Sequence, residues 1–178
     1  MKIEFQKITD YPRGTLCGML ADAYGFDQRW AAAHMDDWRS FDDFFFDNPA
    51  IAGKYGFVTT IDSEPVGFIS WDPRHRPEYE EIGYNCILTK YKRRGYGTRQ
   101  LREAVRRILL DRPKRIIVTT NASLTPAQKM YERVGFRKTG ERPSPAFPGA
   151  LLDYGYISAA DRQLGKQIPP PRRARRTP

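Results

Sequence analysis

The sequence predicts one α/β (α+β) domain with a mixed central sheet of about six to seven strands, flanked by about four helices on both faces. Three observations support this fold class. Short segments with period-two alternation are separated by segments whose apolar residues recur every three to four positions. Helices alternate with strands in the second half, and a hairpin precedes them, so parallel and antiparallel strands share one sheet. The 178 residues, 40% of them hydrophobic, suit a single core.

The first third of the chain predicts a strand followed by helices. Residues 2–8 (KIEFQKI) alternate polar and apolar side chains, as a half-buried strand does. Residues 12–48 carry apolar side chains at helical spacing and predict two helices with a break near Gly25. Because Asn48 precedes a proline, which disfavours the helical conformation, we expect the helical block to end there.

The middle of the chain predicts a hairpin, then a strand that leads through a glycine-rich turn into a helix. A short Asp-Ser-Glu turn joins the two hairpin strands, and the apolar run RIIVTT predicts a short buried strand after the helix. The strands are expected at 55–61, 65–71, 81–89 and 115–120, and the helix at 97–110.

The last part predicts another helix and the end of the sheet. Thr125 can cap a helix whose first turn contains Pro126. Gly135 is expected to end that helix in the left-handed conformation, with Phe136 packing back on it. Residues 148–158 (PGALLDYGYIS) can supply a final strand.

Composition favours a cytoplasmic protein without a membrane span. No apolar run approaches the roughly 18 to 20 residues that a span requires, and the N-terminus lacks the apolar region of a signal peptide. Cys17 and Cys86 are far apart and lack CxxC spacing, so neither a disulfide framework nor a metal site is expected. We expect a domain at 1–160 and a disordered Pro/Arg-rich tail at 161–178.

The net charge of +9 is unevenly distributed. Residues 21–50 contain seven aspartates and two arginines, whereas positive charge is concentrated at 90–115 and in the tail. A basic chain of this kind raises nucleic-acid binding as one hypothesis. For any single one of these charges, a solvated helix face is the better explanation.

Residues 90–101 (KYKRRGYGTRQL) combine a glycine-rich turn with a cluster of cations. The turn opens a helix, so several main-chain N–H groups point the same way and the helix dipole adds partial positive charge. Gly95 and Gly97 allow positive φ and close approach of a ligand to the backbone. The sequence therefore predicts an anion site whose natural ligand is a diphosphate. The surrounding cations are Lys92, Arg93, Arg94 and Arg99.

Two other phosphate loops do not fit this segment. The pattern GxxxxGK[ST] is absent, and the dinucleotide pattern GxGxxG would need a glycine where the chain has Gln100. Taken alone, a basic GxG segment before a helix fits an ordinary basic helix start as well as a phosphate loop. The sequence downstream distinguishes the two.

Two segments together resemble the GNAT superfamily of acetyl-CoA-dependent N-acetyltransferases, including bacterial members. KRRGYG matches its loop pattern Q/R-x-x-G-x-G/A, with lysine at the first position. AQKMYERVGF matches its later signature A-x-x-x-Y-x-x-x-G-F. The resemblance covers residues 1–158 in the order of elements and about 81–137 in motif. It implies a GNAT-like single domain and acetyl-CoA as cosubstrate, with no metal.

The resemblance implies which residues hold the cofactor. In the family the strand before the loop pairs through its backbone with the pantetheine arm, and the loop amides hold the pyrophosphate. Asn121 departs from the pattern, because the family often has its asparagine seven residues before the tyrosine and Asn121 lies ten before it. The implied cofactor-binding residues are Asn85, Cys86, Ile87, Lys92, Arg93, Arg94, Gly95, Tyr96, Gly97, Thr98 and Asn121.

The resemblance also implies catalytic roles. Tyr131 matches the family tyrosine near the CoA sulfur and would protonate the departing thiolate, although an aromatic on the core face of its helix is the alternative. Glu81 is a candidate base for the acceptor amine, and a solvated strand end is the alternative for it. Cys86 is better explained as a small buried apolar residue than as an acyl carrier.

The Asp-rich and aromatic segment 21–50 suggests the acceptor, since the first helices of this family form one wall of the acceptor site. Asp36, Asp37 and Trp38 are the candidate substrate residues. They predict a cationic acceptor: a polyamine, an aminoglycoside-like amine, or a peptide amine. Direct acetyl transfer in a ternary complex follows from the resemblance. A membrane partner is not expected, nucleic acid only through the tail, and a homodimer is left open.

Two hypotheses from other classes remain at this point. A basic nucleic-acid-binding module would use the 90–99 cluster and the RRARR sequence of the tail. An acyl-CoA-binding sensor with a degenerate acetyltransferase fold would bind the cofactor and transfer nothing. The response to acetyl-CoA separates all three.

Overall fold

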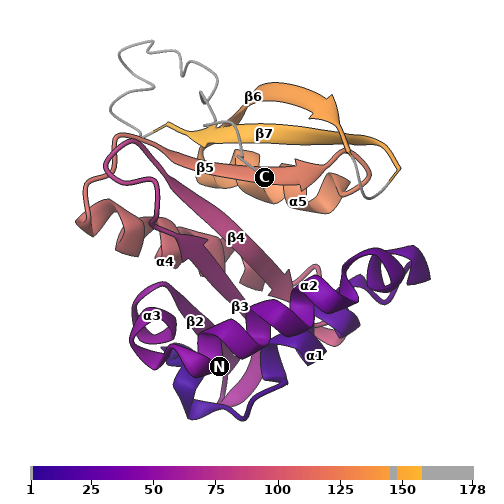
Figure 1. The fold of residues 1–178 in the computed structure, drawn as a ribbon, viewed down its shortest axis with the longest axis vertical. Coiled ribbons are helices and arrows are strands. Elements are labelled where there is room, and N and C mark those ends of the chain that lie inside the picture. Colours follow the sequence, from indigo (N-terminus) through magenta and orange to yellow (C-terminus); the bar gives the residue numbers. More distant parts are fainter. Residues whose placement is uncertain (1, 145–147, 158–178) are drawn as a thin grey trace.

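The computed structural model describes residues 2–144 and 148–157, and the predicted tail at 161–178 lies outside them. Seven strands and five α-helices occur in the described part of the chain (Figure 1). The strands are Ile3–Gln6 (β1), Gly56–Ile61 (β2), Glu64–Asp72 (β3), Glu80–Ile87 (β4), Ile116–Asn121 (β5), Phe136–Pro143 (β6) and Ala150–Tyr156 (β7). The helices are Thr15–Tyr24 (α1), Gln28–Asp47 (α2), Pro49–Lys54 (α3), Tyr96–Leu110 (α4) and Thr125–Val134 (α5), with 3-10 turns at Ile8–Asp10 (η1) and Thr89–Tyr91 (η2).

The strands form one mixed sheet in the order β1-β2-β3-β4-β5-β7-β6. Strands β4 and β5 pair in parallel, and every other neighbouring pair among the described residues is antiparallel. The connection between the parallel strands is α4, as a parallel crossover requires. The predicted fold class, a mixed sheet of six to seven strands with helices on both faces, is confirmed.

The parallel pair of strands separates soon after it forms. Residues 80–82 of β4 pair with residues 116–118 of β5, and the register ends there. Figure 1 shows the two strands leaving a common point and diverging, so that the sheet is splayed at its centre. Residues 83–87 of β4 therefore have no strand partner on the β5 side within the described residues.

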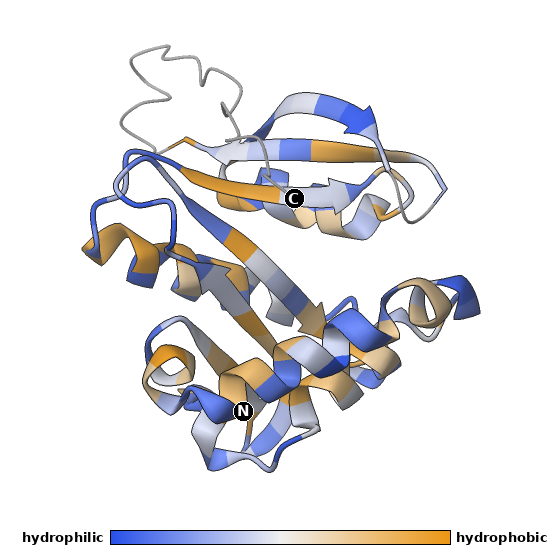
Figure 2. Ribbon diagram, viewed as in Figure 1, coloured by the Kyte–Doolittle hydropathy of each residue, from blue (hydrophilic) through white to orange (hydrophobic). Residues whose placement is uncertain are grey.

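Each face of the sheet is covered by its own helices. Leu101 and Ile108 of α4 pack with Phe57 and Ile69 in one buried cluster. The opposite face carries a second cluster, in which α1 and α2 pack on Val58, Phe68 and Cys86. Hydrophobic and hydrophilic residues alternate along α2 in Figure 2, as burial of one helix face requires. The period-three-to-four pattern in the sequence thus reports burial against the sheet.

The helical block differs from the prediction at its end. Asn48 does leave the helical conformation, with φ −126° and ψ 67°, but Pro49 then begins the short helix α3 instead of ending the block. Proline suits the first position of a helix, because its N–H would be unpaired there in any case. The prediction of a break at Asn48 is therefore confirmed, and the prediction that the helical block ends there is wrong.

A β-bulge in β4 decides which side chains face which helices. Ile69 pairs with Asn85 and Trp71 pairs with Ile82, so three steps on β4 oppose two on β3. The extra residue changes the alternation. Ile82 lies with α4 before the bulge, whereas Cys86 lies with α1 and α2 after it. Strict alternation from the sequence alone would have placed these two residues on one face.

Candidate active site

The glycine-rich turn presents a set of main-chain amides without protein acceptors. Arg93 has φ +64° and Gly95 has φ +81°, so the backbone turns sharply twice before α4 begins. The N–H groups of Arg93, Arg94, Gly95, Gly97 and Thr98 donate to no acceptor among the residues that the structure describes. No side chain caps the helix at Gly95. Amides at a helix N-terminus that lack partners form an anion site.

The two glycines of this turn serve different purposes. Gly95 needs its left-handed φ of +81°, and a Cβ there would meet nothing within 4 Å. Gly97 lies inside α4 without positive φ, and a Cβ there would lie 2.9 Å from Met130 Sδ. Positive φ therefore occurs at Gly95 and not at Gly97, and close approach of a ligand to either backbone stays a prediction. Gly97 instead allows α4 to pack closely on α5.

Three of the four predicted cations surround the turn. Arg93, Arg94 and Arg99 are exposed and pair with no carboxylate among the described residues, although Arg94 lies 5.7 Å from the Tyr91 ring centroid. Lys92 differs from them, because its ammonium donates to the carbonyl oxygen of Ala23 at the end of α1. Burial lowers the pKa of Lys92. Lys92 therefore joins the turn to α1 instead of facing solvent.

A second contact holds α1 against the turn. The side chain of Asp22 accepts a hydrogen bond of 2.6 Å from the Thr89 amide, and the Thr89 hydroxyl donates to the Asp22 carbonyl oxygen at 2.9 Å. Asp22 was counted from the sequence only as part of the acidic segment. Its carboxylate instead fixes the entrance to the turn.

At the end of β4, where β5 has diverged, neighbouring side chains face opposite sides of the sheet. Ile87 lies against Gly97 in the α4 packing, while Cys86 is buried in the cluster under α1 and α2. Burial raises the pKa of the Cys86 thiol to about 12. A thiol that stays protonated is a poor nucleophile, so this geometry agrees with an apolar role for Cys86.

Tyr131 lies on α5 facing the sheet and is 5% exposed. Its ring is an edge partner of Phe136, with centroids 5.8 Å apart, and lies 6.1 Å from that of Tyr154. Burial raises the pKa of Tyr131 to about 12, and the Asn85 side chain lowers it in part. The phenol is therefore protonated near neutral pH and also contributes to the core.

Gln100 is a buried polar residue that sequence reasoning did not select. It is 0% exposed, and its carboxamide nitrogen donates to Asn85 Oδ1 at 2.8 Å. The same nitrogen reaches the carbonyl oxygens of Phe68 and Cys86. The only signal in the sequence was a glutamine among the apolar residues on the buried side of a helix.

The two glutamates at the start of β4 have different surroundings. Glu80 is fully buried and lies 3.3 Å from Arg76 Nε, and burial raises its pKa while Arg76 lowers it. Glu81 is half-buried and acts electrostatically on Arg74. Because alternate residues of a strand face opposite ways, Glu81 points away from the face that Ile82 shares with α4. Glu81 therefore lies on the opposite face of the sheet, which is the face that α1 and α2 cover.

Most aspartates of the acidic segment are used by the fold. Asp42 is buried and accepts from the amides of Gly14, Leu16 and Cys17, so it caps α1 from a neighbouring helix. Asp43 and Asp47 pair with Arg13, and Asp27 caps α2. These side chains hold the helices together and leave little charge for a substrate.

The predicted acceptor residues therefore divide into two groups. Asp36 and Asp37 are 98% and 73% exposed, with only distant partners at 3.5 Å or more. The pKa of Tyr84 is raised mainly by burial and secondly by the charge of Asp37. The carboxylate of Asp37 therefore lies near β4. Trp38 is 2% exposed and packs beside Tyr24 and His34. Trp38 thus supports α2 from inside and does not belong to an exposed wall.

Asn121 lies at the end of β5, and its side chain is occupied by the following loop. Its oxygen accepts from the amide and hydroxyl of Ser123, and its nitrogen donates to the carbonyl oxygen of Pro148. The sequence had already placed Asn121 outside the family spacing. The side chain orders the connection between β5 and α5.

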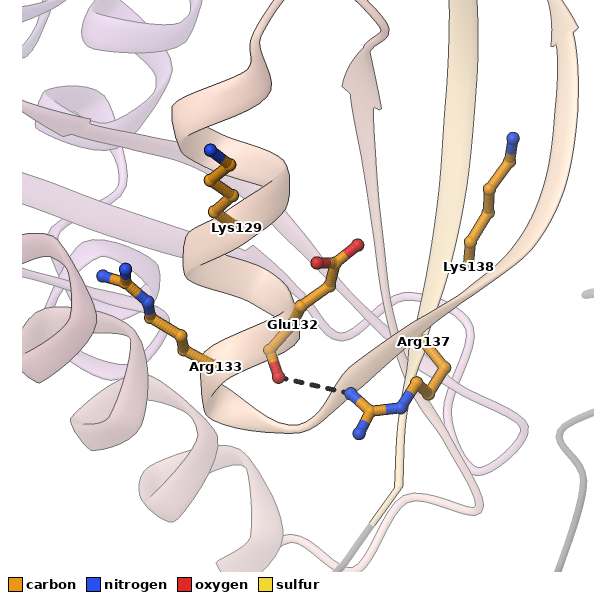
Figure 3. Close-up of a pocket in the computed structure, with 5 residues that line it drawn as sticks. All are labelled: Lys129, Glu132, Arg133, Arg137 and Lys138. Atoms are coloured by element: carbon orange, nitrogen blue, oxygen red, sulfur yellow. Dashed lines mark hydrogen bonds between the residues drawn. The ribbon is translucent and has the colours of Figure 1, made fainter.

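A separate basic pocket lies between α5 and β6, and none of the predicted site residues lines it (Figure 3). Four cations surround one carboxylate there, and Arg137 donates to the main-chain oxygen of Glu132. Lys138 is paired with Glu141 at 2.6 Å. The lining residues are Lys129, Glu132, Arg133, Arg137 and Lys138.

Residues 2–144 and 148–157 contain neither a cluster of metal ligands nor a membrane span. No group of three or more His, Cys, Asp or Glu side chains there is placed to hold a metal ion. None of the helices there has both the length and the apolarity needed to cross a bilayer.

Solved structures share this fold. A GNAT-family protein from Desulfovibrio desulfuricans superposes with a TM-score of 0.72 at 18% identity, over 86% of this chain and 98% of its own. The PaiA N-acetyltransferase of Thermoplasma acidophilum, solved with coenzyme A, superposes with a TM-score of 0.70 at 13% identity, over 86% and 98% of the two chains. At such identities the likeness concerns the fold alone.

Sequence comparison identifies the family. Mycothiol acetyltransferase of Corynebacterium glutamicum is 33% identical over 73 residues, which are 41% of this chain but only about a quarter of that protein. The profile of the Acetyltransferase (GNAT) family matches residues 17–136, about two thirds of the chain. The chain therefore belongs to the GNAT acetyltransferase family.

Proposed function

We propose that this enzyme transfers the acetyl group of acetyl-CoA to a primary amine in a ternary complex. The observation that carries the proposal is the set of main-chain amides at residues 93–95, 97 and 98 that have no acceptors in the described part of the chain. They follow residues 83–87 of β4, which pair with no described strand on the β5 side. A diphosphate needs several N–H donors that converge on one point, and the turn supplies them. Arg93, Arg94 and Arg99 add charge around it.

The free side of β4 fits the pantetheine arm. That arm carries two amides, which can pair with a strand edge as an added strand would. Residues 83–87 of β4 offer such an edge, since β5 has diverged from them. In the proposal the main chain of Asn85, Cys86 and Ile87 binds the arm, and the turn after β4 binds the pyrophosphate.

Direct transfer agrees with the state of Cys86. An acyl-enzyme would need an accessible thiolate, whereas Cys86 is buried and its pKa is raised to about 12. In the proposed reaction the amine nitrogen attacks the thioester carbon and the carbon–sulfur bond then breaks. Tyr131 gives its proton to the departing sulfur, and a base takes a proton from the amine. Glu81 remains our candidate for that base.

Exposed carboxylates favour a cationic acceptor. Asp36 and Asp37 are the aspartates of α2 whose charges are least compensated, and Asp37 acts on Tyr84 of β4. Negative charge beside the reacting strand concentrates amines. Formation of a homodimer and binding of nucleic acid through the tail stay predictions.

The proposal is tested by thermal unfolding and by turnover. Acetyl-CoA at a hundred times its Kd should stabilise the native state by about 2.7 kcal/mol. A panel of amines that includes polyamines and peptide amines should then reveal release of free CoA. Tyr131→Phe should lower kcat about 100-fold or more while the acetyl-CoA KM changes little.

Each rival hypothesis gives a different pattern in the same experiment. A sensor would be stabilised by acetyl-CoA and would release no CoA with any amine. A nucleic-acid-binding module would show no stabilisation by acetyl-CoA and strongly salt-dependent binding of RNA or DNA. A flat response to every acyl-CoA would contradict the proposed function.

A further inference from the structure

The side chain of Gln100 joins helix α4 to three neighbouring strands. It lies in the second turn of the helix and is 0% exposed. Its carboxamide oxygen accepts from the Thr59 hydroxyl of β2 at 2.6 Å. Its nitrogen donates to the carbonyl oxygen of Phe68 on β3 at 2.8 Å and to that of Cys86 on β4 at 3.1 Å. The same nitrogen donates to Asn85 Oδ1 at 2.8 Å, so neither polar atom of this buried group lacks a partner.

The main chain fixes the orientation of this carboxamide. Carbonyl oxygens only accept hydrogen bonds, so the nitrogen of Gln100 must face Phe68 and Cys86. Turning the group over would bring oxygen against oxygen and would leave a buried N–H group without those partners. Gln100 therefore holds α4 and β4 in one relative position.

Gly67 of β3 makes room for the carbonyl group that Gln100 binds. A Cβ at Gly67 would lie 2.2 Å from the Cys86 carbonyl oxygen and 2.7 Å from Ile87 Cδ1. The first of these atoms belongs to the main chain and cannot move unless β4 moves with it. A glycine inside a strand often marks such a close approach of another backbone. Here the approaching backbone is that of Cys86 and Ile87, which the proposed function assigns to the pantetheine arm.

The side chain of Ile87 brings the first turn of α4 to the same place. Its Cδ1 lies against Gly67, and its Cγ1 lies 3.4 Å from the position that a Cβ of Gly97 would occupy. The first turn of α4 contains the amides of Gly97 and Thr98, which have no acceptors among the described residues. The bonds of Gln100 and the packing of Ile87 thus set the position of these amides relative to the edge of β4.

We infer that Gln100 is a positioning residue of the cofactor site, which holds the amides of the turn at the correct distance from the edge of β4. The inference rests on the proposed function, in which the turn binds the pyrophosphate and residues 83–87 bind the pantetheine arm. A ligand that spans two sites binds tightly only where their separation matches its own length. Gln100 should therefore contribute to the affinity for whole CoA and not to that for a diphosphate alone.

CoA and ADP distinguish these two contributions. ADP has a diphosphate and no pantetheine arm, so it tests the turn by itself. Thermal shifts at ligand concentrations up to the millimolar range give the Kd of each ligand. Gln100→Met keeps the length of the side chain and removes its hydrogen bonds. Its Kd for CoA should rise about 10-fold, whereas its Kd for ADP should stay within about 2-fold of the parent value.

Gly67→Ala changes the same contact from the side of β3. Its Cβ would displace the Cys86 carbonyl group, so CoA should again bind about 10-fold more weakly while ADP binding is kept within about 2-fold. The melting temperature of each variant shows whether it is folded, and either variant decides the question if the other does not fold.

Thr59→Val is the matched control. It removes a buried hydrogen bond to the same carboxamide and leaves the bonds from Gln100 to β4 in place. The melting temperature should fall, and the Kd values of CoA and ADP should both stay within about 2-fold. A loss of CoA affinity as large as that of Gln100→Met would show that any defect in this part of the core weakens binding, and the inference would fail.

Two further outcomes would overturn the inference. Equal weakening of CoA and ADP in Gln100→Met would mean that Gln100 shapes the turn itself and not its distance from β4. An unchanged Kd for CoA in that variant would mean that the contact has no role in binding. A parent protein that responds to neither CoA nor ADP would contradict the proposed function instead, so the two failures are distinguishable.

Discussion

The turn before α4 and the acidic segment at residues 21–50 were both selected from the sequence by their charge, and they turn out differently. In the turn, the main-chain amides of residues 93–95, 97 and 98 have no acceptors among the residues that the structure describes. In the acidic segment, Asp42, Asp43 and Asp47 are already bound to amides or to Arg13. The turn has donors left for a ligand, as the proposed function requires, whereas most aspartates of the acidic segment are engaged in contacts within the fold.

The difference follows from the groups that each region uses for recognition. A site made of main-chain amides depends on backbone conformation, which glycine positions and a following helix reveal in the sequence. A site made of side chains depends on which of them the fold has used, and spacing along the chain does not show this. Charge density alone therefore did not show which aspartates the fold uses, and the cofactor site at the turn stays a proposal that rests on its main-chain amides.

The largest effect is expected at Asp42. Asp42→Ala removes the acceptor for the amides of Gly14, Leu16 and Cys17 at the start of α1. Leu16 and Cys17 lie in the first turn of the helix, where an amide has no carbonyl acceptor within the helix. The free energy of unfolding should fall by about 2 to 3 kcal/mol, which lowers the melting temperature by about 5 to 10 °C. Calorimetry or chemical denaturation measures this.

Asp43→Ala is the matched control for that change. Asp43 is exposed and its pair with Arg13 lies at the surface, so its removal should cost less than about 1 kcal/mol. Equal losses for the two variants would mean that the acidic segment acts by its total charge. The comparison between internal and binding carboxylates would then be wrong.

The sequence predicted more of the main-chain architecture than of the side-chain contacts. The hairpin, the order of helices and strands and the glycine-rich turn before α4 follow from local patterns, each of which spans few residues. The contacts of Asp42 with α1 and of Asp22 with Thr89 join segments far apart in the chain. The same holds for Gln100, whose partners lie on β2, β3 and β4. No periodicity within a segment reports such contacts.

The β-bulge shows a second limit. Alternation predicts that Ile82 and Cys86 share a face, and the extra residue between them reverses this. The bulge is defined by the register with β3, which only the paired strands reveal. For the same reason the face of each predicted pantetheine residue could not be read from β4 alone.

In the turn, Gly95→Ala should have the next largest effect. Alanine pays roughly 1 to 2 kcal/mol in the left-handed conformation, and relief of that strain would rotate the amides beside it. We expect the acetyl-CoA KM to rise about 10-fold, with kcat at saturation little changed. Steady-state kinetics with varied acetyl-CoA measures this. An unchanged KM would show that the amides are not the recognition element.

A smaller effect is expected from the exposed carboxylates of α2. The double substitution Asp36→Asn and Asp37→Asn should raise the KM of a cationic amine about 3- to 5-fold and leave that of a neutral amine unchanged. The effect should weaken in high salt, because both side chains are exposed. Identical KM values for both amines before and after the change would remove the acceptor role of this segment.

The smallest effect distinguishes the two glycines of the turn. Gly97→Ala places a Cβ 2.9 Å from Met130 Sδ, and the end of a methionine side chain can move. Alanine also favours the helix by up to about 1 kcal/mol, which offsets the repacking. We expect the acetyl-CoA KM to stay within about 2-fold of the parent and the melting temperature to change little. Since Gly97 has no positive φ, a loss as large as that of Gly95→Ala would mean that ligand approach, and not helix packing, requires glycine there.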